Sequence, residues 1–359
     1  MSTPDEPHVS IVTPVYNGEP YLAECIESVL AQTYSNWDYT IVNNCSTDRS
    51  LEIAEQYAQK DSRIRIHRNK TFLAIMENAN NAVRQISPRA KYCKNLSADD
   101  WMYPECIARM VEIAEANPSV GLVGSYQLSG GGGKWCVRTF GLPYFSNVVS
   151  GFEIGRAHLL GKLDVLGNPT SSLYRSDLIR RTDSFYPNTT PEADISACFE
   201  CLKVSDFGFV HQVLSFERLH PGQITNTSQS MHAYFANKIG DLRTYGPFYL
   251  GPEEQESRIN ELMDEYYEKL ALSAINFRGS EFWAYHRQRL RDVGSSLSSL
   301  RLTKAISTKL LDLLLNPKET SEKLLKSFSK LMYRRSAIGS KRMWRCRNAN
   351  KAEPHEQTT

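Results

Sequence analysis

The sequence contains neither a long apolar run nor a cluster of cysteines. No stretch of about 18 consecutive apolar residues occurs among its 359 residues, which argues against a membrane-spanning helix. Residues 1–8 are polar and acidic, unlike a secretory signal, so we expect a cytoplasmic protein. The eight cysteines lack the spacing of a disulfide framework, and we expect them to be reduced. With 41% hydrophobic and 23% charged residues, the chain has the composition of an ordinary globular protein.

Two of the cysteines, Cys198 and Cys201, have the spacing of half a zinc site. No second pair and no nearby pair of histidines completes it. We therefore expect both thiols to lie on the buried face of a helix.

Acidic residues are absent from residues 323–352, which contain ten of the 42 lysines and arginines. The rest of the chain has 32 basic and 40 acidic residues, so the basic surface is local and nucleic acid is not an expected partner. Apolar positions in residues 319–332 fall on one face of a helix. Such a basic amphipathic helix either lies on an anionic membrane surface or packs against the rest of the protein.

Short β-branched runs alternate with helical patterns along the first 125 residues. This order predicts right-handed βαβ units and a doubly wound, mostly parallel α/β sheet of the Rossmann-like kind, with helices on both faces. The predicted strands are residues 9–15, 37–43, 64–66, 92–96 and 120–125. The predicted helices are residues 21–32, 51–59, 72–86 and 104–116.

The second half of the chain becomes helical. After an irregular stretch with a flexible glycine turn at residues 130–133, we expect a helix over residues 193–202 and a strand over residues 207–216. From residue 230 onward every pattern is helical: residues 231–245, 253–277, 282–293, 303–315 and 319–332. We therefore predict a nucleotide-binding domain over residues 1–229, a helical domain over residues 230–333 and a basic tail over residues 334–359.

Polar side chains follow the predicted parallel strands, where such sheets bind ligands. Tyr16 offers an apolar plate for a nucleoside, and the amides of Asn43 and Asn44 suit a pyrimidine edge or a ribose hydroxyl. The alternative is a polar loop in which Ser46 and Asp48 cap the following helix. The candidate nucleotide-binding residues at these two strand ends are Thr13, Pro14, Tyr16, Asn17, Asn43, Asn44 and Asp48.

Two adjacent carboxylates, Asp99 and Asp100, follow the fourth predicted strand. Such a pair is unfavourable unless it is solvated or binds a metal, and its oxygens suit Mg²⁺ or Mn²⁺ shared with a diphosphate. The alternative is an acidic start to the helix that begins near Pro104.

Three motifs in this order resemble the family-two glycosyltransferases of the GT-A fold: VSIVTPVYN at residues 9–17, IVNNCSTD at 41–48 and LSADD at 96–100. The resemblance covers roughly residues 8–227. It implies an inverting hexosyltransferase that uses a nucleoside diphosphate sugar, with UDP-sugars favoured, and a divalent metal. The acceptor would be a saccharide or a lipid-linked glycan in surface polysaccharide synthesis. Asp99 matches the metal-binding Asp of the family's Asp-x-Asp element and would also contact the donor.

The chain departs from the family pattern at two places. Ser97 stands where the first Asp of Asp-x-Asp is expected, and Asn43 and Asn44 stand where two acids are usual. Asp100 then becomes a second candidate metal ligand. These departures concern the nucleotide and the metal more than the reaction.

Two later elements also resemble family motifs. Glu192 and Asp194 resemble the Glu-Asp element that supplies the general base, with Asp194 as first choice and Glu192 as second; the alternative is a helix N-cap. Arg218 and His220 resemble an Arg-x-His element, in which the arginine binds a donor phosphate and the histidine either completes the metal shell or pairs with the diphosphate leaving group. We assign the polar loop at residues 167–172 to the acceptor side.

Two competing functions stay open at this point. A nucleotidyltransferase would share the sheet and the metal, but it would need a glycine-rich phosphate loop, which Asn17-Gly-Glu-Pro20 is not. A catalytically degenerate protein that binds nucleotide sugars is the other, because of the departures at Ser97, Asn43 and Asn44.

Overall fold

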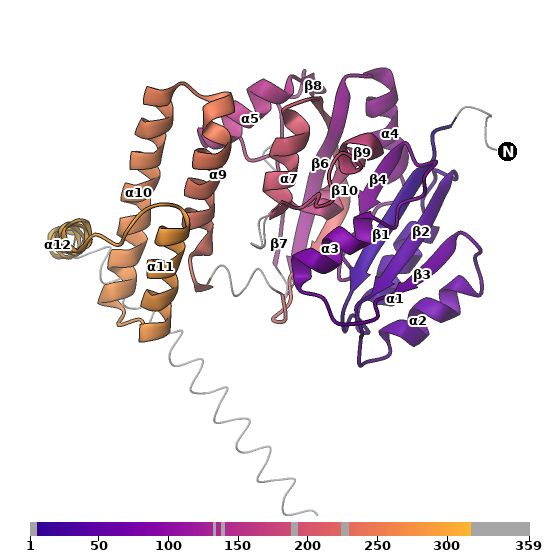
Figure 1. Ribbon diagram of the computed structural model, residues 1–359, viewed down its shortest axis with the longest axis horizontal. Helices are drawn as coiled ribbons and strands as arrows, with labels where there is room; N and C mark the ends of the chain where they lie inside the picture. The colour runs from indigo at the N-terminus through magenta and orange to yellow at the C-terminus, as the bar shows by residue number, and fades with distance from the viewer. Residues whose placement is uncertain (1–5, 132–133, 138–140, 188–192, 224–229, 317–359) are drawn as a thin grey trace, which may run out of the picture. The chain divides into compact units, whose positions relative to one another are not determined.

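The computed structural model describes residues 6–131, 134–137, 141–187, 193–223 and 230–316. Within these residues ten strands form one sheet, in the order β3-β2-β1-β4-β9-β6-β10-β5, with β7 paired to β6 and β8 paired to β10 (Figure 1). The strands are β1 (Val9–Val15), β2 (Trp37–Asn43), β3 (Ile64–Arg68), β4 (Tyr92–Asn95), β5 (Trp101–Met102), β6 (Val120–Gly131), β7 (Lys134–Val137), β8 (Val148–Val149), β9 (Ser172–Arg175) and β10 (Asp206–Arg218).

Helices cover both faces of this sheet, as the alternating pattern predicted (Figure 1). One apolar core includes buried residues of α1 (Leu22–Leu30), α2 (Ser50–Ala58) and α4 (Cys106–Ala116). The opposite core includes residues of α3 (Ile75–Val83), α5 (Gly151–Leu159) and α7 (Ala193–Leu202). Strands β1 to β4 are parallel to one another. The prediction of a mostly parallel α/β sheet is therefore confirmed.

The centre of the sheet contains a strand that the sequence did not indicate. Strand β9 pairs antiparallel with β4 on one side and with β6 on the other. It follows a turn of 3-10 helix, Pro169–Ser171, and its four residues are too short for a recognisable alternation. In the glycine-rich stretch, β6 continues to Gly131 and pairs with β7 as a hairpin.

Cys198 and Cys201 lie buried on α7, as the sequence predicted, and contribute to the core around it.

The helices after residue 230 are α9 (Ala233–Tyr249), α10 (Pro252–Ile275), α11 (Ser280–Asp292) and α12 (Ser299–Leu315), close to the predicted ranges. The chain divides into two compact units. The first comprises Met1–Met263 with Arg289–Ser295, and the second comprises Asp264–Gln288 with Ser296–Thr359. The boundary predicted at residue 230 stays a prediction.

In the first unit, Tyr245 of α9 stacks on Phe199 of α7 with ring centroids 4.7 Å apart. In the second, the Tyr267 hydroxyl accepts a hydrogen bond from the Ser298 amide at 2.7 Å. None of the helices in the described ranges is both long and apolar enough to cross a membrane. The predicted helix over residues 319–332 and the basic tail over 334–359 lie outside those ranges.

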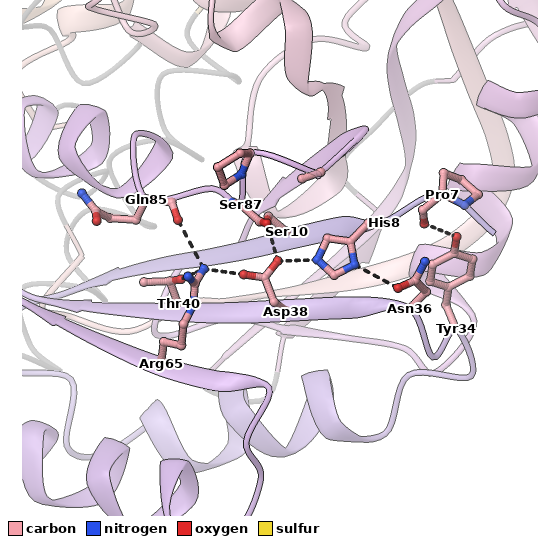
Figure 2. A network of polar contacts seen from close by, with 12 residues as sticks. Pro7, His8, Ser10, Tyr34, Asn36, Asp38, Thr40, Arg65, Gln85 and Ser87 are labelled. Carbon is pink, nitrogen blue, oxygen red and sulfur yellow. Dashed lines mark hydrogen bonds and ion pairs between the residues drawn. The ribbon is translucent and has the colours of Figure 1, made fainter. Parts of the chain in front are cut away.

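A buried carboxylate ties the amino-terminal ends of β1, β2 and β3 together. The carboxylate of Asp38 accepts hydrogen bonds from the Ser10 hydroxyl at 2.5 Å and from the His8 ring at 2.8 Å, and it also pairs with Arg65 (Figure 2). The Ser10 oxygen in turn accepts from the Ser87 amide at 2.9 Å. Because His8 is buried, this network fixes the strand ends that lie opposite the polar loops.

We expect Asp38→Ala to lower the free energy of unfolding by about 3 kcal/mol, because buried His8 and Ser10 would lose their shared acceptor. Urea denaturation followed by circular dichroism measures this. The matched control is Glu52→Ala, which removes a carboxylate from an exposed ion pair with Arg49 and should leave the midpoint nearly unchanged. Equal midpoints for both variants would show that the network does not stabilise the fold.

Candidate functional site

The carboxyl ends of β1, β2 and β4 meet at one edge of the sheet. Val15 pairs with Asn43, and Val12 pairs with Asn95, so the loops that follow these strands are neighbours. Hydrogen bonds join the loops after β1 and β2. The side-chain oxygen of Asn17 accepts from the Thr47 amide at 2.8 Å. One site is thus assembled from three segments that are far apart in the sequence.

Asp48 secures the same junction. One of its oxygens accepts from the Glu19 amide at 2.9 Å and the other from the Ser50 amide at 3.0 Å. Partial burial raises the pKa of Asp48, but the hydrogen bond from the Ser50 hydroxyl, together with those from the two amides, lowers it overall. Helix α2 begins at Ser50, so Asp48 both holds the β1 loop and serves the helix start. Its assignment to donor binding stays a prediction.

The two asparagines at the end of β2, Asn43 and Asn44, are buried, and the side chain of Asn44 is hydrogen-bonded within the protein. Its side-chain oxygen accepts from the Leu73 amide and from the Asn69 side chain, and its nitrogen donates to the Leu73 carbonyl at 2.9 Å. The Asn43 oxygen accepts from the Ser46 amide at 3.4 Å. Asn44 therefore shapes the loop at residues 69–73, whereas contact of either amide with a nucleotide stays a prediction.

Aromatic rings from two loops lie exposed beside these amides. Tyr16 is 50% exposed, and its ring meets that of Phe72 edge to face, with centroids 4.9 Å apart. Thr13 is buried, and its hydroxyl oxygen accepts from the Tyr39 hydroxyl at 2.8 Å. Tyr16 thus presents a surface, while Thr13, followed by Pro14 in β1, belongs to the wall behind it. Phe72 was not identified from the sequence, because a lone aromatic in a polar stretch carries no pattern.

Asp99 and His220, two of the predicted metal ligands, lie in contact with each other. The Asp99 oxygen Oδ2 lies 3.0 Å from Nε2 of His220, whose ring packs on Tyr21 with centroids 4.8 Å apart. These two atoms share a hydrogen bond, and a carboxylate oxygen and an imidazole nitrogen are both groups that bind divalent ions. The pair would therefore supply two ligands to a divalent ion. Within the described ranges, no group of three or more His, Cys, Asp and Glu side chains has such an arrangement.

Arg218 lies against the same pair. Its Nε donates to the Asp99 carbonyl oxygen at 3.1 Å, and its guanidinium lies 4.9 Å from the centre of the Tyr21 ring and pairs with Glu24. A positive charge beside a carboxylate that is a candidate metal ligand is suited to a diphosphate. The sequence analysis did not identify Tyr21 and Glu24, which lie at the start of α1, as site residues. The local sequence of a helix start does not indicate a contact with Arg218, which lies nearly two hundred residues further along the chain.

Asp100 is buried, and both of its carboxylate oxygens accept hydrogen bonds. Oδ1 accepts from the Arg218 amide at 3.0 Å and Oδ2 from the Thr170 hydroxyl at 2.7 Å. Burial and then the charge of Asp99 hold the pKa of Asp100 well above its usual range. Helix α4 begins only at Cys106, so Asp99 and Asp100 do not form the acidic start of that helix. Asp100 therefore supports the site, and direct ligation of a metal by it stays a prediction.

A buried lysine holds the segment that contacts Asp100. Lys94 in β4 is fully buried, and its ammonium donates to the carbonyl oxygens of Thr170 at 2.6 Å and Ser172 at 3.0 Å. Thr170 uses its hydroxyl oxygen to accept from the Ser97 amide at 3.2 Å as well. The loop at residues 167–172, which we assigned to the acceptor side, thus also holds Asp100 and the turn at Ser97 in place. The sequence analysis did not identify Lys94. A charged residue inside a predicted buried strand was a signal that could have identified it as a structural residue.

Asp194 lies in the first turn of α7, where Oδ1 accepts from the Ile195 amide at 2.9 Å. Burial of its carboxyl group raises the pKa of Asp194 to about 6, although the backbone hydrogen bonds oppose this. A carboxylate with that pKa is suited to accept a proton near neutrality. Glu192 lies outside the described residues.

A mostly parallel sheet with helices on both faces, a polar site at its strand ends and helices after it define a GT-A-like α/β fold. The sequence profile of the family described as "Glycosyl transferase family 2" matches residues 10–181. An uncharacterized glycosyltransferase of Rickettsia prowazekii is 30% identical over 226 residues, which are 62% of this chain and 67% of that protein. The chain therefore belongs to glycosyl transferase family 2, as the resemblance predicted.

Other relatives match over shorter segments. The uncharacterized glycosyltransferase EpsJ of Bacillus subtilis is 40% identical over 112 residues, which are 31% of each chain. The match thus spans less than a third of that relative's length. These matches show the family, and neither the activity nor the substrates of this chain follow from them.

Solved structures confirm the fold. The structure of S. aureus TarS 1-349 in complex with UDP-GlcNAc superposes with a TM-score of 0.59 at 15% identity, covering 88% of each chain. The mannosyltransferase PcManGT from Pyrobaculum calidifontis, in complex with GDP-Man and Mn²⁺, superposes with a TM-score of 0.50 at 14% identity, covering 88% of this chain and 83% of that one.

We expect Thr170→Val to lower the free energy of unfolding by about 2 kcal/mol, because buried Asp100 would lose a donor and Ser97 an acceptor. The hydrogen bond from Thr170 favours charged Asp100 and so lowers its raised pKa. The loss of unfolding free energy in Thr170→Val should therefore be larger at pH 8 than at pH 5, because more of the Asp100 carboxyl group is ionised at pH 8. Urea denaturation at both pH values measures it, with Ser171→Ala as the control. A deficit that is larger at pH 5 would contradict this assignment.

Proposed function

We propose that this chain is an inverting, metal-dependent hexosyltransferase that uses a UDP-sugar donor. Its acceptor would be a saccharide or a lipid-linked glycan in surface polysaccharide synthesis. The observation that carries the proposal is the Asp99–His220 pair, which lies beside Arg218 at the ligand-binding edge of the sheet. Family membership and the fold shared with a UDP-GlcNAc complex support it.

The donor would lie across the three joined loops. Tyr16 and Phe72 offer apolar surface to the base, while Thr13, Pro14 and Asn17 form the adjoining wall. Since the side chain of Asn44 is committed to the loop at residues 69–73, base recognition would fall more to Asn43 and to main-chain groups. Arg218 would leave Glu24 or share its guanidinium in order to reach the diphosphate.

A divalent ion, Mn²⁺ or Mg²⁺, would be held by Asp99 and His220, with Asp100 behind them. Such an ion supplies positive charge that stabilises the departing nucleoside diphosphate. Because Ser97 replaces a carboxylate in the family element, the protein offers few ligands and the donor phosphates would supply others. Metal affinity should therefore be weak without donor.

Asp194 would act as the general base that takes the proton from the acceptor hydroxyl as the new bond forms, with Glu192 as the second choice. Its raised pKa supports this role, because the carboxylate is basic enough to accept a proton yet mostly ionised at pH 7. Peripheral attachment of a cytoplasmic enzyme to an anionic membrane, through residues 319–332, is proposed on the sequence pattern alone.

We expect Asp99→Ala to reduce donor turnover by at least about 10²-fold, because the carboxylate that positions the metal is lost. The assay incubates the protein and Mn²⁺ with UDP-glucose, UDP-galactose, UDP-GlcNAc and GDP-mannose, and measures nucleotide release. Glu112→Ala, which removes an exposed carboxylate on α4, is the control and should retain full turnover. Donor binding by the wild-type protein without any turnover would favour the degenerate nucleotide-sugar-binding alternative.

The pH dependence of transfer tests the base. With Asp194 as base, the rate should fall about tenfold per pH unit below pH 6, since protonated Asp194 cannot accept the proton. Asp194→Asn should retain donor binding but lose about 10²- to 10⁴-fold in transfer rate. Normal transfer by this variant would exclude Asp194 as the base.

A further inference from the structure

A row of aromatic rings begins directly beside the carboxylate pair. Trp101 follows Asp100 in the chain, and its ring stacks on that of Phe216, with centroids 4.9 Å apart and planes at 19°. Trp135 of β7 packs on the other side of Phe216, with centroids 5.3 Å apart. We call Trp101, Phe216 and Trp135 the aromatic row.

The strand register places this row on one face of the sheet. Phe216 pairs with Trp101 across β10 and β5, and Trp135 pairs with Gly130 across β7 and β6. Arg218 lies two residues beyond Phe216 on the same face, and its guanidinium is 5.9 Å from the centre of the Phe216 ring. The row is therefore continuous with the Arg218 and Asp99 side of the site.

A glycine makes room for the row. A Cβ atom added at Gly130 would lie 2.8 Å from the Trp135 ring and 3.0 Å from the Phe216 ring. Any side chain larger than hydrogen would therefore displace one of the rings. The absence of a side chain at Gly130 leaves room for both rings.

The outer end of the row is open to solvent. Phe216 is buried between its two neighbours, whereas Trp135 is 65% exposed, and Val137 on the same face of β7 is also exposed. Single exposed rings are common on protein surfaces, but this one ends a row of packed rings that begins at the candidate site. An exposed indole ring offers an apolar face, so its ligand should be apolar where it touches the ring.

We propose that the aromatic row is the acceptor subsite and binds an uncharged hexose ring of the acceptor glycan by stacking on Trp135. The C–H face of a pyranose is a small apolar surface that matches one indole ring, while its hydroxyls stay in water. Continuity with Arg218 and Asp99 places the bound sugar next to the donor diphosphate. This inference rests on the proposed function for the identity of the ligand as an acceptor, although the binding itself can be measured without turnover.

The test measures binding of cellobiose, maltose, chitobiose and mannobiose to the full chain, in the presence of UDP and Mn²⁺, by saturation-transfer NMR. At least one disaccharide should bind to the wild-type protein. Trp135→Ala should weaken that binding about tenfold, and Trp135→Phe should retain most of it. Phe145→Ala, which removes a ring that is 90% exposed elsewhere, should have no effect.

A second variant tests the row with Trp135 in place. Gly130→Ala should weaken binding of the same disaccharide, because the added methyl group displaces the rings, while the thermal midpoint reports whether the fold is kept. Nucleotide release from the donor without acceptor should be unchanged in Phe145→Ala, which removes an exposed ring outside the proposed subsite.

Three results would overturn the inference: no disaccharide binds, Trp135→Ala binds as well as wild type, or Trp135 contacts phosphatidylcholine vesicles in preference to sugar. In each of these cases donor turnover that depends on Asp99 would still support the proposed function. Disaccharide binding through Trp135 without any donor turnover would instead support the subsite and contradict the proposed function.

Discussion

The site depends on one buried carboxylate, that of Asp100. Taking a carboxylate out of water is costly, and the protein compensates with a hydroxyl from Thr170 and a main-chain amide from Arg218. Those two donors belong to segments that must therefore come to the end of β4. Once they are there, Lys94 secures the Thr170 segment, and Arg218 brings His220 to Asp99. The partly exposed pair of Asp99 and His220 is thus positioned by a buried residue, Asp100.

The two ends of the parallel strands have different physical roles. At the amino-terminal ends, Asp38 is surrounded by donors from the protein, so its network is complete and stabilises the sheet. At the carboxyl ends, Asn17, Asp48 and Asn44 use their polar atoms to join loops, while Asp99 and Tyr16 stay partly exposed. A rigid frame that leaves a few groups open is the arrangement that binding and catalysis need.

The departures from the family pattern have structural explanations that differ from residue to residue. Asn44 is a neutral group inside a network of amides, where a carboxylate would face the Leu73 carbonyl oxygen and be repelled by it. Cys45, which follows it, has φ of 58°, a left-handed conformation that glycine adopts more easily. The main chain of Ser97 contacts the side chains of Thr170 and Cys25. These contacts hold the turn after β4 in place, so a carboxylate at position 97 is not needed for that purpose.

The sequence by itself determined the alternation of strands and helices, the parallel sheet, the family and the grouping of polar residues at the strand ends. These follow from periodicity and from motifs of adjacent residues, which are local properties. Only the tertiary structure decided that β9 enters the sheet between β4 and β6, and that Thr170 and Arg218 meet Asp100 across 70 and 118 residues. It also decided that Trp135 lies beside Phe216. Contacts between distant segments depend on how the elements pack, and no short stretch of sequence contains that information.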